Sequence, residues 1–237
     1  MAGITDVHVH VQPFRMLKPE ITESMKAERR NFENLLRMSD DPRFFLNILD
    51  EAGVERACLI NYVAPDVIGF LPTVNEYVIE YAKADRNRLI PFGSIHPAYT
   101  KDVEEEAKDL VRKGVGGFKV HPPHQLLWPN DPRLEPIYRV AEDAGVPVMI
   151  HSGTSTFPSA KSRYGDPMYV DDVAVDHPDL KILLAHGGRP LWCDAAFFLA
   201  RRPRNLYIDI SSIPPRRLLA YFPRIEKIGD KIVFGSD

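Results

Sequence analysis

Two histidines near the start of the chain stand two residues apart. His8 and His10 lie in residues 4–11, ITDVHVHV, where polar and apolar residues alternate. The alternation predicts a β-strand with both imidazoles and Asp6 on one face and the valines on the other. Two imidazoles at this spacing can chelate one metal ion. The H-x-H pattern is only moderately specific, because packed structural histidines also produce it.

Four more residues that can bind metal end later apolar runs. His121 follows GGFKV, His151 follows VPVMI, His186 follows KILLA, and Asp237 ends KIVFGSD. If these runs are parallel strands of one barrel, their carboxyl ends converge on one rim, where the active sites of such barrels lie. Imidazole nitrogens and a carboxylate hold Zn²⁺ or another divalent first-row metal. The sequence therefore predicts a divalent metal site, with Zn²⁺ favoured and Mn²⁺ or another first-row metal as alternatives.

Eight short β-branched runs recur about every 32 residues, the length of a strand, a turn, a three-turn helix and a second turn. Residues 74–82 and 218–228 between them carry apolar positions at helical spacing. Glycines in EAGVER, RKGVGG and DAGVPV stand where a helix would end just before a strand. The expected strands are residues 4–11, 56–63, 89–96, 115–121, 147–151, 181–186, 206–210 and 231–235.

Alternating strands and helices predict right-handed crossovers and a parallel sheet. Eight units close most economically into a single (β/α)8 TIM barrel over residues 1–237, an α/β fold. An open doubly wound sheet is the alternative, but no G-x-G-x-x-G follows the first run. Residues 12–40 form a charged insertion, either a lid or an extra solvated helix. The sequence ends at Asp237, where an eighth helix should begin, so we expect the barrel to lack its last helix.

The composition restricts the class of protein. Of the 237 residues, 44% are hydrophobic and 27% charged, as in a globular protein with a full core. A net charge of −3 does not favour binding to nucleic acid or to an anionic membrane. No apolar run approaches the ~18 residues of a spanning helix, and the start of the chain lacks a secretory signal pattern. Cys58 and Cys193 alone make no disulfide framework, so a reducing cytoplasm is expected.

The ordered set DVHVH, FKVHP, MIHSG, LAHGG and FGSD resembles the amidohydrolase superfamily. More narrowly, it is similar to the amidohydrolase-related (amidohydrolase 2) branch, which includes aminocarboxymuconate-semialdehyde decarboxylase. The resemblance extends from residue 4 to residue 237. It implies a metal held by His8, His10, His151 and Asp237. His186 would then be the acid, base or charge-stabilising group, and Asp237 would take the proton of the attacking water.

Lys119 and His121 are two residues apart, so both should face the same side of the fourth strand. In binuclear members of the superfamily, a lysine on this strand is carboxylated and bridges two metals. In the mononuclear relatives, as here, the lysine stands two positions before a strand-end histidine. We therefore expect one metal, with Lys119 and His121 facing substrate or supporting the ligands. The alternative is that Lys119 neutralises a buried carboxylate.

The remaining histidines have simpler interpretations. His96 ends the third expected strand and either lines the pocket or is a hydrogen-bonded rim residue. His124 either contacts substrate from its loop or is structural. His177 precedes a proline at an expected helix end, where a histidine favours the helix dipole.

These features predict a metal-dependent hydrolase that uses an activated water on a small carboxylate, lactone, ester or amide. The alternative is a metal-dependent decarboxylase of a small unsaturated or aromatic carboxylic acid. A trinuclear phosphoesterase and a non-catalytic metal-binding barrel are more distant alternatives. The expected partner is a small molecule, not nucleic acid or a membrane, and the resembling proteins suggest a homodimer. Decarboxylation would be favoured by an arginine of the insertion that points at the metal, and the candidates are Arg15, Arg29, Arg30 and Arg37.

Overall fold

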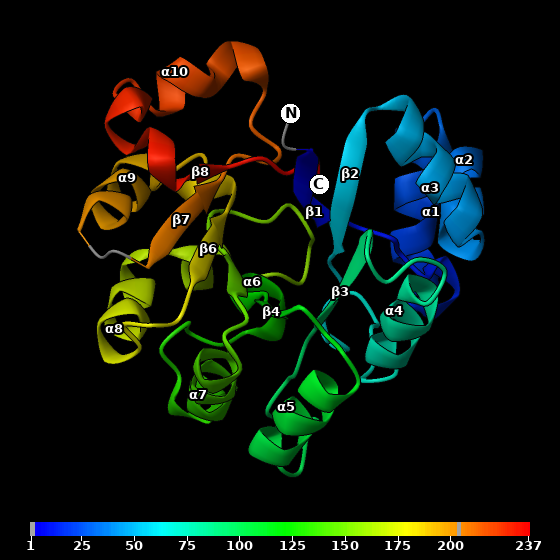
Figure 1. The fold of residues 1–237 in the computed structure, drawn as a ribbon, viewed down its shortest axis with the longest axis horizontal. Coiled ribbons are helices and arrows are strands. Elements are labelled where there is room, and N and C mark those ends of the chain that lie inside the picture. The colour runs from blue at the N-terminus through cyan, green and yellow to red at the C-terminus, as the bar shows by residue number, and fades with distance from the viewer. Residues whose placement is uncertain (1–2, 203–204) are drawn as a thin grey trace.

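The computed structural model describes residues 3–202 and 205–237. Eight parallel strands follow one another in chain order, each paired with the next (Figure 1). Helices lie between successive strands on the outside, so the predicted (β/α)8 TIM barrel is confirmed. The strands are β1 (Ile4–Val9), β2 (Val54–Leu59), β3 (Leu89–Gly93), β4 (Gly117–Val120), β5 (Val148–His151), β6 (Ile182–Ala185), β7 (Leu206–Asp209) and β8 (Ile232–Val233).

The barrel is closed between its first strand and the segment that follows its last strand. The backbone N–H of Val7 donates to the carbonyl oxygen of Phe234 at 3.0 Å, and the N–H of Asp237 donates to the carbonyl oxygen of His8 at 2.7 Å. The residues after β8 therefore lie beside β1 (Figure 1). This closure brings Asp237 against the strand that carries the H-x-H pattern.

The helices cover the outer face of the sheet. Val74 and Val78 of the expected helical stripe are fully buried. Gly145 ends α7 with φ +68°, a conformation that glycine adopts without strain, as the DAGVPV motif predicts. The helices are α1 (Pro19–Glu28), α2 (Phe32–Asp40), α3 (Pro42–Glu51), α4 (Val74–Ala82), α5 (Val103–Arg112), α6 (Pro122–Gln125), α7 (Glu135–Ala144), α8 (Met168–Asp176), α9 (Cys193–Arg201) and α10 (Leu218–Tyr221).

Residues 218–228 form two short helices rather than the single helix that their apolar spacing suggests. α10 ends at Tyr221, and the 3₁₀ helix η6 (Ile225–Lys231) follows it. Pro223 lies between the two, where it supplies no N–H for a continuous helix and its ring clashes with the preceding turn. Phe222 and Ile228 are nevertheless buried, so the apolar spacing serves the packing of both pieces.

Alternation along the strands sends one set of side chains into the barrel. The register aligns Met149 of β5 with Leu183 of β6. Two residues further along each strand, Ala185 aligns with both His151 and Asp209. Residues two apart on a strand share a face, so an apolar layer containing Met149 and Leu183 underlies a layer that contains His151 and Asp209.

The insertion at residues 12–40 contains a 3₁₀ turn, α1 and α2. Its side chains Phe14 and Phe32 belong to one buried cluster with Tyr62 and Ile68 from the loop after β2. The N–H of Lys18 donates to the carbonyl oxygen of Ile68 at 2.9 Å. The insertion is therefore anchored to the loop after β2. Over residues 3–202 and 205–237, no helix is long and apolar enough to cross a membrane.

His177 follows α8, at the helix end where the sequence placed it, and joins this helix to α7. Its Nδ1 lies 3.0 Å from Glu142 and its Nε2 lies 2.8 Å from Glu135. Burial alone would lower the pKa of His177, but the hydrogen bonds to the two glutamates outweigh burial and raise this pKa. The folded protein therefore binds this proton more tightly than the unfolded chain does.

Protonated His177 should stabilise the fold in a pH-dependent way. Its contribution is fully present below the ordinary histidine pKa of about 6.5 and is lost as the pH rises through the raised pKa of the folded state. We expect the difference in melting temperature between wild type and His177→Gln to be largest near pH ~6 and to shrink toward pH ~9. Thermal unfolding across this range measures it. A difference that does not change with pH would contradict the expectation.

Candidate metal centre

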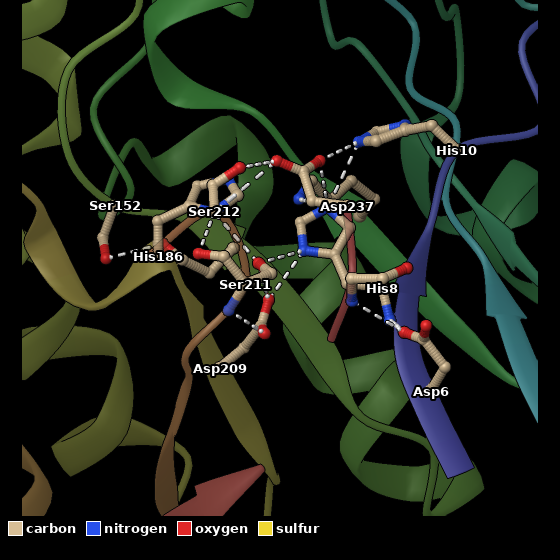
Figure 2. A network of polar contacts seen from close by, with 12 residues as sticks. Asp6, His8, His10, Ser152, His186, Asp209, Ser211, Ser212 and Asp237 are labelled. Carbon is tan, nitrogen blue, oxygen red and sulfur yellow. Dashed lines mark hydrogen bonds and ion pairs between the residues drawn. The ribbon is translucent and has the colours of Figure 1, made fainter. Parts of the chain in front are cut away.

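His8, on β1, is held in one orientation by β7. Its Nδ1 lies 2.6 Å from Oδ2 of Asp209, and both side chains are fully buried (Figure 2). The same carboxylate accepts hydrogen bonds from the backbone N–H of Ser211 at 2.9 Å and from its hydroxyl at 2.7 Å. Because Nδ1 of His8 donates to Asp209, the lone pair of His8 stays on Nε2, where it can bind a ligand.

Potential metal ligands meet at Nε2 of His8 (Figure 2). Nε2 of His10 lies 3.2 Å away and Oδ1 of Asp237 lies 3.6 Å away. The same oxygen of Asp237 is 3.2 Å from Nε2 of His10. The structure thus brings together three of the four residues that the resemblance implies as ligands.

His186, directly after β6, approaches the other oxygen of Asp237. Its Nδ1 lies 4.0 Å from Oδ2 of Asp237, which also accepts a hydrogen bond from the hydroxyl of Ser212. The backbone carbonyl and the hydroxyl oxygen of Ser211 lie 3.2 and 3.0 Å from the same nitrogen of His186. His8, His186 and Asp237 each offer a ligand atom within 4.8 Å of the others. His186 is therefore close enough to hold a metal together with Asp237, or to exchange a proton with it through one water.

His151 ends β5 and packs between two other imidazoles. Its ring centroid lies 4.8 Å from that of His186 and 4.0 Å from that of His121. Nε2 of His151 and Nδ1 of His121 are buried and have no hydrogen-bond partner among the described residues. A buried polar atom without a partner is costly, so each nitrogen is well suited to a bound ligand.

Lys119 lies beneath the two histidines of β1. It is 1% exposed, and its Nζ is 3.3 Å from Nε2 of His8. Burial lowers the pKa of Lys119 to about 8, although the charges of Asp237 and Asp209 oppose this shift. Lys119 thus stands near the buried carboxylate of Asp209 and the partly exposed carboxylate of Asp237, and it points into the barrel on the same side as the site.

Burial disfavours the charged form of three imidazoles of the site. It is the main cause that lowers the pKa of His8 and of His151 well below 6.5, and that lowers the pKa of His186 to about 3. Burial alone would raise the pKa of Asp237, but a hydrogen bond from His10 and the charges of neighbouring imidazoles hold that pKa far below its usual range. The lowered pKa values of His8, His151 and His186 and of the Asp237 carboxyl favour the deprotonated forms that metal binding requires.

The donor set fits a divalent metal ion. An imidazole nitrogen of His8 fixed by a carboxylate, a second imidazole from His10 and an oxygen of Asp237 converge. The unpartnered Nε2 of the buried His151 offers a fourth donor nearby. Nitrogen and carboxylate donors of this kind bind Zn²⁺ and other first-row metals.

Three residues of the site were not singled out by sequence reasoning. Asp209 and Ser211 orient His8 from β7 and the residues after it, and the ring of Tyr62 packs 4.5 Å from that of His121. Asp209 could have been recognised from the sequence, because it is a carboxylate at the end of an apolar run, as Asp237 is. No sequence pattern identifies Ser211 or Tyr62, since both residue types are common in loops.

The arginines of the insertion have other surroundings. The guanidinium of Arg37 lies over the ring of Phe44, 4.1 Å from its centroid, and Arg15 lies close enough to Tyr77 to influence its pKa. Within the described residues, no hydrogen bond or ion pair joins an arginine of residues 12–40 to the site.

Gly235, between β8 and Asp237, lets the chain pass close to the site. A Cβ atom built there would lie 2.6 Å from Oδ1 of Asp209 and 2.7 Å from Cβ of His8. We expect Gly235→Ala to lower the free energy of unfolding by about 1–3 kcal/mol and to weaken metal binding, because both side chains must shift. Urea denaturation of the metal-free protein measures the first effect. Gly229→Ala is the matched control, since a Cβ at Gly229 meets nothing within 4 Å; equal losses in the two variants would contradict the prediction.

The fold and the site together define a class of protein, a TIM barrel whose strand ends gather histidines, a lysine and aspartates around a candidate metal centre. The sequence profile of the amidohydrolase family (Amidohydro_2) matches residues 5–237. The chain therefore belongs to the amidohydrolase family. A comparison with curated proteins gives no match.

Several solved structures share the fold. An uncharacterised TIM-barrel protein from Bordetella bronchiseptica has a TM-score of 0.74 at 23% identity, over 98% of this chain and 85% of that chain. A dihydroxybenzoic acid decarboxylase from Polaromonas, with bound manganese, has a TM-score of 0.69 at 17% identity, over 100% and 86%. A probable 2-pyrone-4,6-dicarboxylic acid hydrolase from Acinetobacter baumannii has a TM-score of 0.65 at 17% identity, over 100% and 84%. At these identities the likenesses show the fold alone.

Proposed function

We propose that the protein is a metal-dependent hydrolase that uses an activated water on a small carboxylate, lactone, ester or amide. The observation that carries this proposal is the position of the Asp237 carboxylate. Its Oδ1 faces the two imidazoles of β1, and its Oδ2 faces His186. A carboxylate placed in this way can act at the metal with one oxygen and accept a proton with the other.

His8, His10, His151 and Asp237 are the residues proposed to hold one divalent ion, with Zn²⁺ favoured over Mn²⁺. When bound, such an ion supplies a water whose pKa falls from 15.7 to about 7. Asp237 accepts a proton from the attacking water at Oδ2. His186, neutral and hydrogen-bonded to Ser211, orients or polarises the substrate and exchanges a proton with the carboxylate. His121, with its free Nδ1, faces the substrate.

A decarboxylase is the second candidate, and Lys119 favours it. A departing carboxylate needs a cation, and the buried ammonium of Lys119 lies 3.3 Å from His8 in the centre of the site. Manganese bound to a decarboxylase of the same fold also supports a metal in that reaction. Two arginines of the insertion favour hydrolysis instead. An arginine that points at the metal is expected in a decarboxylase, whereas Arg37 lies over the ring of Phe44 and Arg15 lies near Tyr77.

The two reactions differ in their products. Ester, lactone or amide hydrolysis with zinc- or manganese-loaded protein should release an acid, which a pH indicator detects. Decarboxylation of aromatic acids should release CO₂ instead, which a coupled assay detects. Asp237→Ala is the control in both assays. Acid release that is lost in this variant would support the hydrolase, CO₂ release alone would replace it with the decarboxylase, and neither product from metal-loaded protein would favour a non-catalytic barrel.

A further inference from the structure

We propose that Tyr62, His124 and Ser155 form a proton relay that connects the candidate metal centre with solvent. The relay rests on the proposed function in one respect, because it serves a reaction at that centre. Both candidate reactions move a proton at this centre: hydrolysis releases one, and decarboxylation consumes one.

The relay is a continuous line of hydrogen-bonding atoms. The hydroxyl oxygen of Tyr62 lies 3.1 Å from Nδ1 of His124, and Nε2 of His124 lies 2.7 Å from Oγ of Ser155. Each imidazole nitrogen thus has a hydroxyl partner. Hydroxyls both donate and accept, so either tautomer of His124 keeps both hydrogen bonds. A proton can therefore shift along the line without any movement of the heavy atoms.

The two ends of the relay lie in different environments. Tyr62 is 5% exposed, and its ring packs 4.5 Å from that of His121 and, edge-on, 6.1 Å from that of the candidate ligand His10. His124 is 2% exposed. Ser155, in the loop after β5, is half-buried and reaches the surface. The relay therefore begins beside the site and ends at solvent.

Neighbouring groups hold the three members in place. The ring of His124, on α6, stacks on that of His121 at 3.8 Å. The backbone N–H of Ser155 donates to the hydroxyl of Ser162 at 3.2 Å, and that hydroxyl lies 3.3 Å from the carbonyl oxygen of Ser155. Tyr62 belongs to the buried cluster between the insertion and the loop after β2. The three residues come from the loops after three different strands, β2, β4 and β5, so only the folded barrel brings them into line.

One concerted shift moves one proton outward. A proton from the site binds the hydroxyl oxygen of Tyr62, and the original hydroxyl proton of Tyr62 passes to Nδ1 of His124. The proton on Nε2 of His124 passes to Oγ of Ser155, and the hydroxyl proton of Ser155 passes to water. No member gains or loses net charge, and the reverse sequence carries a proton inward. Because burial lowers the pKa of His124 to about 3, its imidazole stays neutral, as this shift requires.

The tautomer of His124 tests the relay without any substrate. In ¹⁵N-histidine-labelled zinc-loaded protein, long-range ¹H–¹⁵N correlation shows which ring nitrogen carries the proton, and His124→Gln identifies the signals. We expect intermediate shifts at both nitrogens of His124 in wild type, because the two tautomers exchange. Tyr62→Phe should fix the proton on Nε2. A single tautomer in wild type that Tyr62→Phe leaves unchanged would overturn the relay.

Turnover of 4-nitrophenyl acetate tests whether the relay carries protons during catalysis. Glutamine at position 124 can keep both hydrogen bonds but cannot shift a proton between its two polar atoms. We expect His124→Gln to lower kcat about tenfold or more and to raise the solvent deuterium isotope effect, with the metal content unchanged. Thr156→Ala, an exposed hydroxyl beside Ser155, should change neither quantity.

The outcomes separate the relay from the proposed function. Full turnover and an unchanged isotope effect in His124→Gln would overturn the relay and leave the hydrolase proposal intact. Wild-type protein that shows no metal-dependent turnover of the ester would count against the hydrolase proposal, while the tautomer measurement would still decide whether the proton can shift along the line.

Discussion

His151→Ala protein is expected to purify without its metal, whereas His186→Ala protein is expected to keep the metal and lose turnover. His151 offers a buried nitrogen with no other partner, so its removal deletes a ligand. His186 instead has Ser211 as a hydrogen-bond partner and faces the second oxygen of Asp237. Loss of an acid–base group lowers turnover by roughly 10²–10⁴-fold. Elemental analysis of desalted protein, together with the rate of substrate hydrolysis, measures both effects.

His96→Ala is the matched control for this pair. His96 is a buried rim histidine whose Nδ1 accepts from the N–H of Ala98 at 3.2 Å, and its ring packs against that of Tyr99. It should therefore keep both metal and turnover. The opposite pattern, an empty site in His186→Ala and a full site in His151→Ala, would show that the ligands are His8, His186 and Asp237, whose donor atoms lie within 4.8 Å of one another.

Asp209→Asn is expected to weaken metal binding by about 10–100-fold, although Asp209 is not a proposed ligand. One oxygen of this carboxylate accepts from His8 and the other accepts from the N–H of Ser211. An asparagine must turn its NH₂ group toward one of these donors. If the NH₂ group faces His8, the proton of the imidazole moves to Nε2 and occupies the lone pair that binds the metal. Competition with a coloured chelator measures the affinity.

Asp6→Asn separates this effect from the loss of a buried charge. Asp6 is also buried, and burial raises its pKa. Its Oδ1 accepts from the backbone N–H groups of His8 and Ser236, both at 3.0 Å, and the side chain of Ser236 also hydrogen-bonds this carboxyl. Asparagine can keep Oδ1 in place. We expect a much smaller change in metal affinity for Asp6→Asn. Equal weakening in the two variants would show that charge, not the tautomer of His8, determines the affinity.

The sequence was sufficient for the barrel and for most residues around the candidate site. Strand-end residues such as His151, His186 and Asp237 could be recognised because parallel strands bring their carboxyl ends to one rim. The strand ends themselves were predicted too long by two to four residues in β1 to β3, because β-branched runs continue into loops that leave the sheet. The single helix suggested by residues 218–228 was interrupted at Pro223, whose effect outweighs the apolar periodicity.

The partners of each site residue could not be predicted. The contact between His8 and Asp209 depends on the barrel radius and on the rotamers of residues on β1 and β7, which are 201 positions apart. The line from Tyr62 through His124 to Ser155 depends on three loop conformations, and a single sequence does not encode these in a periodic pattern. Residue types thus indicated which groups could do chemistry, and only the fold showed which atoms meet.

The seam between β1 and the residues after β8 has a consequence for folding. Ser236 donates to Asp6 across 230 positions of sequence, so this contact closes one of the longest loops in the chain. Such long-range contacts are slow to form and are expected late in folding. A metal bound by His8 and Asp237 would join the first strand to the residues after the last strand, and mass action would favour the closed barrel. The ion would then stabilise the closed barrel as well as take part in the reaction. Proteases should therefore cut the metal-depleted protein first beside the contact between β1 and the residues after β8.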